Sequence, residues 1–331
     1  MNTMRCIQID RYGGLDAMIH RELAVPAPGP GELLVRVRCA GINFMDIHTC
    51  EGKYANSQTY AVSLPCTLGM EGAGEVVTAG AGVEGFSAGD RVAWCIVWGS
   101  YAEYAAVPAW RAVKLPDALS FEQAAAALFH GLTAHYLAAD VGCLAPGVTC
   151  LVHAASGGIG QILIQFARRA GARVFVTTST PEKAAVARAR GAELALPYDG
   201  FADAVRAATG GRGVDVVFDP LGKATLRESF RAARKRGLIV SFGAVAGAVR
   251  DLDPLELGEA GSLFLTRPRL ADHIADAATT QRRAADIFGA LLDGSLRIEV
   301  AGRYTLDTAI EALRALESRR MLGKPLLVME S

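Results

Sequence analysis

The cysteines of this sequence lack the pairing that a disulfide framework or a cysteine-rich zinc lobe requires. They number seven, are scattered along the chain, and never form a C-x-x-C pair. Disulfide-rich domains and cysteine zinc sites show even-numbered, regularly spaced cysteines. The pattern therefore indicates that most of these cysteines are buried thiols.

The chain also lacks a surplus of charge and a long apolar run. Lys and Arg together number 34, and so do Asp and Glu. Nonspecific binding to nucleic acid or to an anionic membrane surface needs an excess of positive charge. No stretch reaches the ~18 apolar residues of a membrane span, and the opening residues MNTMRCIQIDRYGG contain no signal-peptide core. We expect a cytoplasmic protein with no nucleic-acid and no membrane partner.

The length of 331 residues favours two domains. Up to about residue 120, short apolar runs such as MRCIQID and GDRVAWCI alternate with Gly and Pro. This pattern predicts a compact, mostly β domain that needs no helix before Ser120. Ser120 and Gln123 then form a capping-box start for an alanine-rich helix.

Strands and helices alternate in the second part of the chain, as in a doubly wound parallel sheet. The strands are predicted at 149–154, 173–178, 194–197, 214–218, 237–242 and 262–266, and the helices at 158–170, 181–190, 200–209 and 222–234. After Pro268 two helical segments and the short strand KPLLVME follow, and we expect this tail to return to the first domain. The predicted fold class is α/β, with domains at 1–123 plus 268–331 and at 124–267.

The stretch CLVHAASGGIG, from Cys150 to Gly160, has the order strand, glycine turn, helix. Glycines allow the backbone to approach a pyrophosphate, and the N–H groups at the helix start face its charge. Small residues at this spacing also occur in ordinary tight turns. The next strand, RVFVTT, completes a βαβ unit of about 30 residues, which favours a dinucleotide site.

The residues after that second strand favour NADPH over NADH. An NAD site usually has an Asp or Glu there, about 20 residues beyond the glycine turn. This chain instead has Thr177-Thr178-Ser179-Thr180, and Lys183 follows Glu182. Hydroxyls and a lysine suit a 2′-phosphate, which needs donors and positive charge. The alternative for Lys183 is a solvated residue in the first turn of a helix.

Six segments in order along nearly the whole chain resemble a known family. They are GINFMDIHTCEGKY, LGMEGAGEVVTAGAGV, AGDRV, HAASGGIGQ, GLIVSFG and GSLFLTRP. The chain resembles the zinc-independent quinone oxidoreductases, the zeta-crystallin-like branch of the medium-chain dehydrogenase/reductase superfamily. This resemblance implies a GroES-like, β-rich catalytic domain and a Rossmann domain that binds NADPH. It also implies that the acceptor is a quinone or another activated carbonyl or alkene.

The resemblance also implies the residues of the cofactor site. The 2′-phosphate would contact Lys183, Tyr198 and Arg319, next to Ser179, and the pyrophosphate would lie on the turn formed by Ser156, Gly157, Gly158, Ile159 and Gly160. The nicotinamide half would contact Phe242, Gly243, Phe264 and Thr266, and Thr133 and Asn43 would touch its end.

The zinc-dependent relatives are the alternative that the resemblance raises. Their catalytic cysteine falls at Asn43 and their histidine ligand at Met70, so both ligands are missing. Zinc prefers thiolate, imidazole and carboxylate to an amide or a thioether. His130 and His135 are five positions apart, which spreads them around a helix. We expect no metal.

Without a metal, another group must handle the charge that develops on the acceptor oxygen. A quinone spreads this charge over its ring, whereas a plain ketone needs a Lewis acid or a strong proton donor. We therefore expect conjugated acceptors, oriented or hydrogen-bonded by Asn43 and Tyr54, with His48 as a further candidate donor. Tyr54 has the alternative role of a loop aromatic that closes the cleft, and His48 that of a structural histidine.

Two further segments bear on specificity and assembly. The stretch between Tyr54 and Pro65 looks longer than in typical relatives, which puts the identity of the acceptor in doubt. The apolar strand from Gly261 to Thr266 suggests a homodimer through a sheet edge, unless the chain's own loops cover it. The alternative functions are an enoyl-thioester reductase and a non-catalytic, crystallin-like nucleotide-binding protein.

Overall fold

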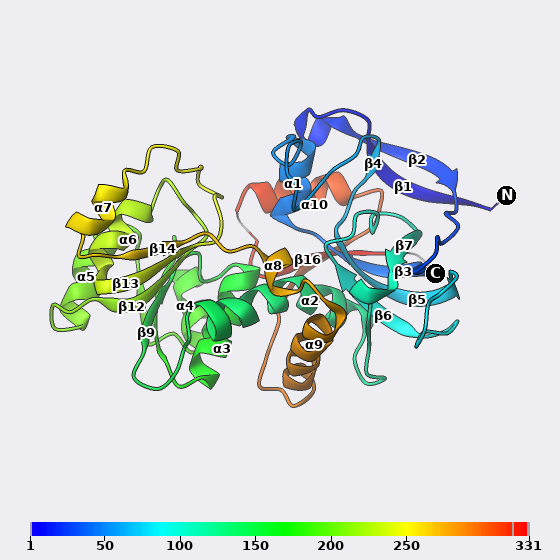
Figure 1. The fold of residues 1–331 in the computed structure, drawn as a ribbon. Coiled ribbons are helices and arrows are strands. Elements are labelled where there is room, and N and C mark those ends of the chain that lie inside the picture. Colours follow the sequence, from blue (N-terminus) through cyan, green and yellow to red (C-terminus); the bar gives the residue numbers. More distant parts are fainter. Residues whose placement is uncertain (1, 320, 330–331) are drawn as a thin grey trace. The chain divides into compact units, whose positions relative to one another are not determined.

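The computed structural model describes residues 2–319 and 321–329, which form two compact units (Figure 1). The first unit comprises residues 1–132 and 274–331, and the second comprises residues 133–273. The boundaries expected from the sequence, at 123/124 and 267/268, stay a prediction for the domains. The expected α/β fold class is confirmed: a β-rich unit is combined with a unit built on a parallel sheet with helices.

Mostly antiparallel strands build the first unit. The smaller sheet has the order β2-β1-β4 and consists of β1 (Thr3–Ile9), β2 (Met18–Ala24) and β4 (Cys66–Thr67). The larger sheet has the order β15-β16-β3-β5-β6-β8, with β7 also paired to β3. Its strands are β3 (Glu32–Gly41), β5 (Glu71–Ala79), β6 (Arg91–Cys95), β7 (Tyr104–Pro108), β8 (Val113–Lys114), β15 (Val300–Tyr304) and β16 (Lys324–Val328). The late strand β16 pairs with the end of β3, so residues far apart in sequence meet there.

One apolar core joins the two sheets of this unit. It includes Ile7 and Ile9 from β1, Val35 from β3, Trp94 from β6 and Leu327 from β16, all of them buried. Burying a side chain of this size stabilises a fold by about 1.5–3 kcal/mol. The core thereby packs β3 and β16 together, and the end of β3 pairs with residues 326–328 of β16.

The helices of the first unit include one that the sequence did not predict. They are α1 (Phe44–Cys50), α9 (Ala277–Leu292), α10 (Ala309–Glu317) and, up to Leu132, α2 (Phe121–Tyr136). The capping box of α2 is confirmed, because Ser120 and Gln123 exchange side-chain to backbone hydrogen bonds of 3.0 and 3.1 Å. The expectation of no helix before Ser120 was wrong.

The short helix α1 forms because its first turn is capped. The Asn43 N–H donates to Asp46 Oδ2 at 2.7 Å, which satisfies a backbone donor just before the helix. The buried Tyr101 hydroxyl donates to the same oxygen at 2.8 Å. Burial raises the pKa of Asp46 to about 7, against the effect of these two hydrogen bonds.

A fully parallel sheet forms the centre of the second unit, in the order β11-β10-β9-β12-β13-β14. Figure 1 labels β9, β12, β13 and β14 of this sheet. Its strands are β9 (Thr149–Val152), β10 (Arg173–Thr177), β11 (Leu194–Leu196), β12 (Val214–Asp219), β13 (Ala233–Ser241) and β14 (Phe264–Thr266). Its helices are α3 (Gly158–Arg169), α4 (Pro181–Ala189), α5 (Phe201–Ala208), α6 (Leu226–Ala232), α7 (Pro254–Glu259) and α8 (Leu270–His273). The strands and helices expected here are all found, with shifted ends.

The largest shift of boundary concerns the helix expected at 222–234, which is only α6 (Leu226–Ala232). The residues before it form a turn around Asp219, whose Oδ1 accepts hydrogen bonds from the N–H groups of Leu221 and Gly222. At the other end the chain is already extended at Ala233, where β13 begins. The turn and the early strand shorten the helix.

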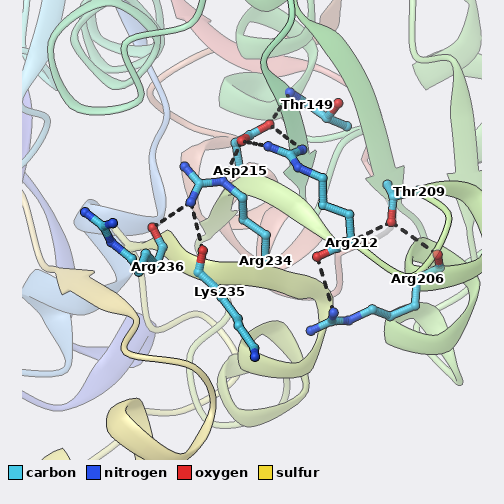
Figure 2. A network of polar contacts seen from close by, with 9 residues as sticks. Thr149, Arg206, Thr209, Arg212, Asp215, Arg234, Lys235 and Arg236 are labelled. Atoms are coloured by element: carbon cyan, nitrogen blue, oxygen red, sulfur yellow. Dashed lines mark hydrogen bonds and ion pairs between the residues drawn. The ribbon is translucent and has the colours of Figure 1, made fainter.

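A network of hydrogen bonds and ion pairs connects the amino ends of β9, β12 and β13 (Figure 2). Asp215 accepts hydrogen bonds from the Thr149 N–H, from Arg212 and from Arg234, at 2.6 to 3.2 Å. Burial alone raises the pKa of Asp215, but these hydrogen bonds outweigh burial and lower it to about 2. The network connects β9, β12 and β13 at the edge opposite the glycine turn.

All seven cysteines are free thiols, and all but Cys143 are buried. Over the described ranges, no helix is both long and apolar enough to cross a bilayer.

Candidate active site

The predicted cofactor residues of the second unit follow the carboxyl ends of its parallel strands. The glycine turn follows β9, Ser179 follows β10, Tyr198 follows β11, and Phe242 follows β13. In an open parallel sheet these ends lie along one edge, where ligands bind. The topology therefore brings residues from four strands to one edge of the sheet.

The glycine turn has the close packing that a dinucleotide turn needs. Ala154 adopts a left-handed conformation with φ of 51°. Helix α3 begins four residues later, at Gly158. A Cβ added at Gly160 would lie 2.6 Å from the Ala154 carbonyl oxygen. Only glycine fits this position without moving the turn, and the N–H groups at the start of α3 are left to face a phosphate.

Three further predicted residues follow β10 and β11, and one of them, Tyr198, contacts this turn. The Ala154 N–H donates to the Tyr198 hydroxyl at 3.1 Å, so this tyrosine contacts the turn directly. The Lys183 ammonium donates to the Ser179 hydroxyl at 3.0 Å, and Ser179 lies two residues beyond the end of β10. The structure thus places a phenol, a hydroxyl and an ammonium after β10 and β11, as a 2′-phosphate site requires.

A buried polar chain beneath the turn was missed by the sequence reasoning. His153 Nδ1 lies 2.7 Å from the Thr177 hydroxyl, and Nε2 lies 2.9 Å from the Ser229 hydroxyl, which reaches Asp219 at 3.2 Å. Burial lowers the pKa of His153 to about 4, so the ring is neutral near pH 7. These contacts connect the ends of β9, β10 and β12. The only sequence feature that could have indicated His153, Thr177 and Asp219 is their position at the ends of three predicted strands.

The residues expected at the nicotinamide half lie in or just after the last two strands. Gly243 packs tightly, because an added Cβ would lie 2.3 Å from the Pro220 carbonyl oxygen. Phe264 and Thr266 lie in β14, and Phe264 is 59% exposed. Thr133 is buried in α2. Their contacts with a nicotinamide stay a prediction.

In the first unit, Asn43 belongs to a buried polar cluster that we call the lysine hub, formed by Asn43, Glu71, His130 and Lys324. The Lys324 ammonium donates to Asn43 Oδ1 at 2.6 Å and to Glu71 Oε2 at 2.7 Å. It also lies 3.4 Å from His130 Nε2. The Lys324 side chain is fully buried, so this ammonium is held entirely by the hub.

The Glu71 carboxylate connects the hub to the backbone around it. Its Oε1 accepts the Phe129 N–H of α2 at 2.7 Å, and its Oε2 accepts from Asn43 Nδ2 at 3.2 Å. Gly41 makes room for it, because a Cβ there would lie 2.2 Å from Oε2. Asn43 Nδ2 also donates to the Gly41 carbonyl at 3.1 Å. Both amide donors of Asn43 are therefore engaged inside the unit.

His48 and Tyr54 lie together at the end of α1. Their ring centroids are 6.2 Å apart, and the Tyr60 ring follows at 5.7 Å from Tyr54. Burial lowers the pKa of His48, and the Lys53 ammonium adds to this effect. The segment after Tyr54 is anchored by the Trp98 indole, which donates to the Ala61 carbonyl at 3.1 Å. Partly exposed rings in edge-to-face contact thus lie at the end of the capped helix and after it.

The residues present do not fit a catalytic zinc ion. Asn43 is hydrogen-bonded to the Lys324 ammonium, and Met70 is buried in the core of the unit. A dication beside a buried ammonium would be repelled, and neither an amide nor a thioether is a preferred zinc ligand. Within residues 2–319 and 321–329, no group of three or more His, Cys, Asp or Glu side chains is arranged to hold a metal.

Arg319 follows α10 in the first unit, with a left-handed φ of 57°. Its predicted contact with the 2′-phosphate, together with Lys183 and Tyr198 of the second unit, stays a prediction. The residues that sequence reasoning missed in the first unit are Glu71 and Lys324. No local pattern indicates them, since Lys324 and Asn43 lie 281 positions apart.

Comparison with known proteins gives consistent matches over nearly the whole chain. Residues 29–117 match the family described as the alcohol dehydrogenase GroES-like domain, and residues 158–266 match that described as zinc-binding dehydrogenase. A quinone oxidoreductase of Pseudomonas aeruginosa is 38% identical over 325 residues, covering 97% of this chain and 98% of that protein. A 2-haloacrylate reductase of a Burkholderia species is 34% identical, covering 98% of each. The structure of Escherichia coli quinone oxidoreductase complexed with NADPH superposes with a TM-score of 0.94 at 35% identity, covering 99% of this chain and all of that one.

Proposed function

The chain belongs to the quinone oxidoreductase branch of the medium-chain dehydrogenase/reductase superfamily, and on this premise we propose that it reduces quinones or other α,β-unsaturated carbonyl compounds without zinc. It is an NADPH-dependent reductase that acts on a small molecule. The observation that carries the proposal of zinc independence is the buried Lys324 ammonium on Asn43 and Glu71.

When bound, NADPH supplies a hydride with its electron pair. The chain's own contribution is to hold this cofactor at the carboxyl edge of the parallel sheet. The turn at Gly157 to Gly160 binds the pyrophosphate, and Ser179, Lys183 and Tyr198 bind the 2′-phosphate, with Arg319 as the further cation that the resemblance adds. Phe242, Gly243, Phe264, Thr266 and Thr133 are assigned to the nicotinamide end.

The acceptor must carry negative charge on oxygen once it has received the hydride. Without a Lewis acid, a conjugated acceptor suits the site, because a quinone or enone delocalises this charge. Tyr54 and His48 are the candidate donors toward the acceptor, and they lie in ring contact with each other. Asn43 has both amide donors engaged within the lysine hub, and its Oδ1 can only accept a hydrogen bond, so we assign it the role of orienting the acceptor and not of hydrogen-bonding the acceptor oxygen.

A homodimer through β14 is part of the proposal. This strand is at the edge of its sheet, and Phe264 on it is 59% exposed. An exposed apolar edge strand favours pairing with a second copy. Light scattering should give a dimer for the natural chain and a monomer for Phe264→Glu. A monomer for both would remove the dimer from the proposal.

The experiment that tests the proposed function is an acceptor panel with purified protein. NADPH oxidation is followed with 1,4-benzoquinone, 1,4-naphthoquinone, an acyclic enone, a 2-haloacrylate and an enoyl thioester. We expect turnover with the quinones or the enone. A preference for the thioester would assign the protein as an enoyl-thioester reductase, and no turnover with any acceptor would leave a nucleotide-binding protein.

The cofactor assignment has its own control in the same assay. Lys183→Ala removes a positive charge that an NADH complex would not use, since NADH has no 2′-phosphate. We expect the variant to bind NADPH at least tenfold more weakly, about 1.4 kcal/mol, with NADH binding unchanged. Equal effects on the two cofactors would contradict the 2′-phosphate role of Lys183.

A further inference from the structure

One imidazole nitrogen of the lysine hub is buried without a hydrogen-bond partner. His130 Nδ1 has no protein partner within the described residues, although its other ring nitrogen, Nε2, contacts the Lys324 ammonium at 3.4 Å. Buried polar atoms in native proteins nearly always have partners, and an exception calls for a reason such as a bound ligand. The orphaned nitrogen therefore points to a group that binds there.

The protonation of the ring follows from its contact with Lys324. An ammonium has only donors, so Nε2 must accept its proton and the ring hydrogen must lie on Nδ1. Burial, together with the Lys324 ammonium, lowers the pKa of His130 well below its ordinary value, so the ring stays neutral. His130 therefore presents a fixed N–H donor whose tautomer is set by the lysine.

The position of this donor suits the reaction. Lys324 contacts both His130 and Asn43, so these two residues flank one ammonium. Asn43 occupies the position where the zinc-dependent relatives have their catalytic cysteine. His130 thus lies in the hub that replaces the metal, and Thr133, one helical turn further along α2, is the residue assigned to the nicotinamide end.

We propose that His130 Nδ1–H donates a hydrogen bond to the carbonyl oxygen of the acceptor and stabilises the negative charge that develops there. This inference rests on the proposed function. The acceptor gains a C–H bond from the hydride and its electron pair, NADPH becomes NADP⁺, and the carbonyl oxygen becomes an enolate or phenolate oxygen. Water then supplies the proton, so His130 keeps its own.

The His130 N–H should contribute most to kcat for acceptors whose product delocalises the negative charge on oxygen least. Removing one donor from an oxyanion site lowers kcat by about 10²–10³-fold in well-studied enzymes. An enolate from an acyclic enone keeps more charge on oxygen than a quinone product does. We therefore expect a larger effect of His130 variants on enone reduction than on quinone reduction.

Two variants separate the donor from the contact with Lys324. In His130→Asn the amide nitrogen occupies the place of Nδ1, so a donor remains while the contact with the ammonium is lost. In His130→Gln the longer side chain reaches the place of Nε2, so the contact with Lys324 is kept while the donor is lost. Thermal unfolding of both variants shows whether either is misfolded, and His130→Phe provides a third variant of similar shape.

The test combines kinetics with binding. We expect His130→Gln to lower kcat for the enone about 100-fold and for 1,4-naphthoquinone less than tenfold, whereas His130→Asn keeps most of both activities. Binding of 4-nitrophenolate to the NADP⁺ complex, read from its absorption shift, should weaken at least tenfold in His130→Gln and little in His130→Asn. The NADPH affinity should be unchanged in both.

Three results would overturn the proposal. Equal losses in His130→Asn and His130→Gln would give the ring a structural role, and weaker NADPH binding with unchanged phenolate binding would place its N–H on the cofactor. Full activity of His130→Gln with every acceptor would show that no donor is needed there. A natural chain inactive with every acceptor would instead refute the proposed function, which separates the two failures.

Discussion

Lys324 is the single residue on which the account of the first unit depends most. Its ammonium is fully buried, and it is the charge partner of the equally buried Glu71. Removing one member of a buried ion pair leaves the other uncompensated, which typically costs about 3–5 kcal/mol. The same ammonium also sets the tautomer of His130 and engages Asn43.

We therefore predict that Lys324→Met lowers the free energy of unfolding by about 3–5 kcal/mol. The double variant Lys324→Met, Glu71→Gln should recover part of this loss, because it removes the stranded carboxylate. Urea unfolding of the natural chain, both single variants and the double variant gives the coupling between the two residues. Additive losses would mean that the ion pair contributes no coupling energy.

Asp215 is the residue for which the structure predicts a pH dependence. Its pKa is lowered from 3.8 to about 2 in the folded chain. The carboxylate thus contributes stability that is fully present above pH ~4 and is lost as the pH falls through about 2. A shift of this size corresponds to about 2 kcal/mol.

The variant Asp215→Asn should accordingly be about 2 kcal/mol less stable than the natural chain near neutral pH. The difference between the two should shrink as the pH falls below ~4. Urea unfolding at several values between pH 7 and pH 3 measures it. A difference that stays constant over this range would show that the charge of Asp215 is not what stabilises the network in Figure 2.

At the scale of elements, the unit β9, glycine turn, α3 is defined by backbone packing at Gly160. An added Cβ would meet the Ala154 carbonyl oxygen at 2.6 Å, and backbone cannot move aside cheaply. Gly160→Ala should shift the turn and weaken NADPH binding at least tenfold. Gly289→Ala in α9 is the matched control, because an added Cβ there meets nothing within 4 Å.

We expect Gly289→Ala to leave NADPH affinity unchanged and to stabilise its helix by up to about 1 kcal/mol. Fluorescence titration with NADPH, together with thermal unfolding, measures both effects. If Gly160→Ala bound NADPH as well as the natural chain, the turn would not contact the pyrophosphate.

The elements that the sequence predicts best are those with local signals. The alternation of β-branched runs and capped helices from Thr149 to Thr266 yields the parallel sheet, because each strand and helix carries its own pattern. Helix α1 was not predicted because it has only seven residues and its start depends on one capping box, formed by Asn43 and Asp46. Short helices show little periodicity.

The candidate site was predictable only where a motif or the resemblance pointed to it. The assignment of Tyr198 to the 2′-phosphate came from the resemblance alone, and its contact with the glycine turn, which joins residues 44 positions apart, was not predicted. The lysine hub combines Asn43 at the cap of α1, Glu71 on β5, His130 on α2 and Lys324 on β16. Contacts of this range follow from the sheet pairing of β16 with β3, which no local pattern reveals.

For the molecule as a whole, we propose a reductase whose first unit carries the buried Lys324 ammonium in the place of a metal. The cofactor is NADPH, and we propose that the acceptor is conjugated, because such an acceptor needs no Lewis acid. Both the family membership of the chain and the chemistry of the lysine hub support this proposal.

Zinc independence is measured as NADPH oxidation by 1,4-naphthoquinone before and after exhaustive chelation, with the zinc content of the protein determined in parallel. We predict turnover that is unchanged by chelation and not increased by added zinc, in protein that contains far less than one zinc per chain. Activity that is lost on chelation and restored by zinc would contradict the account.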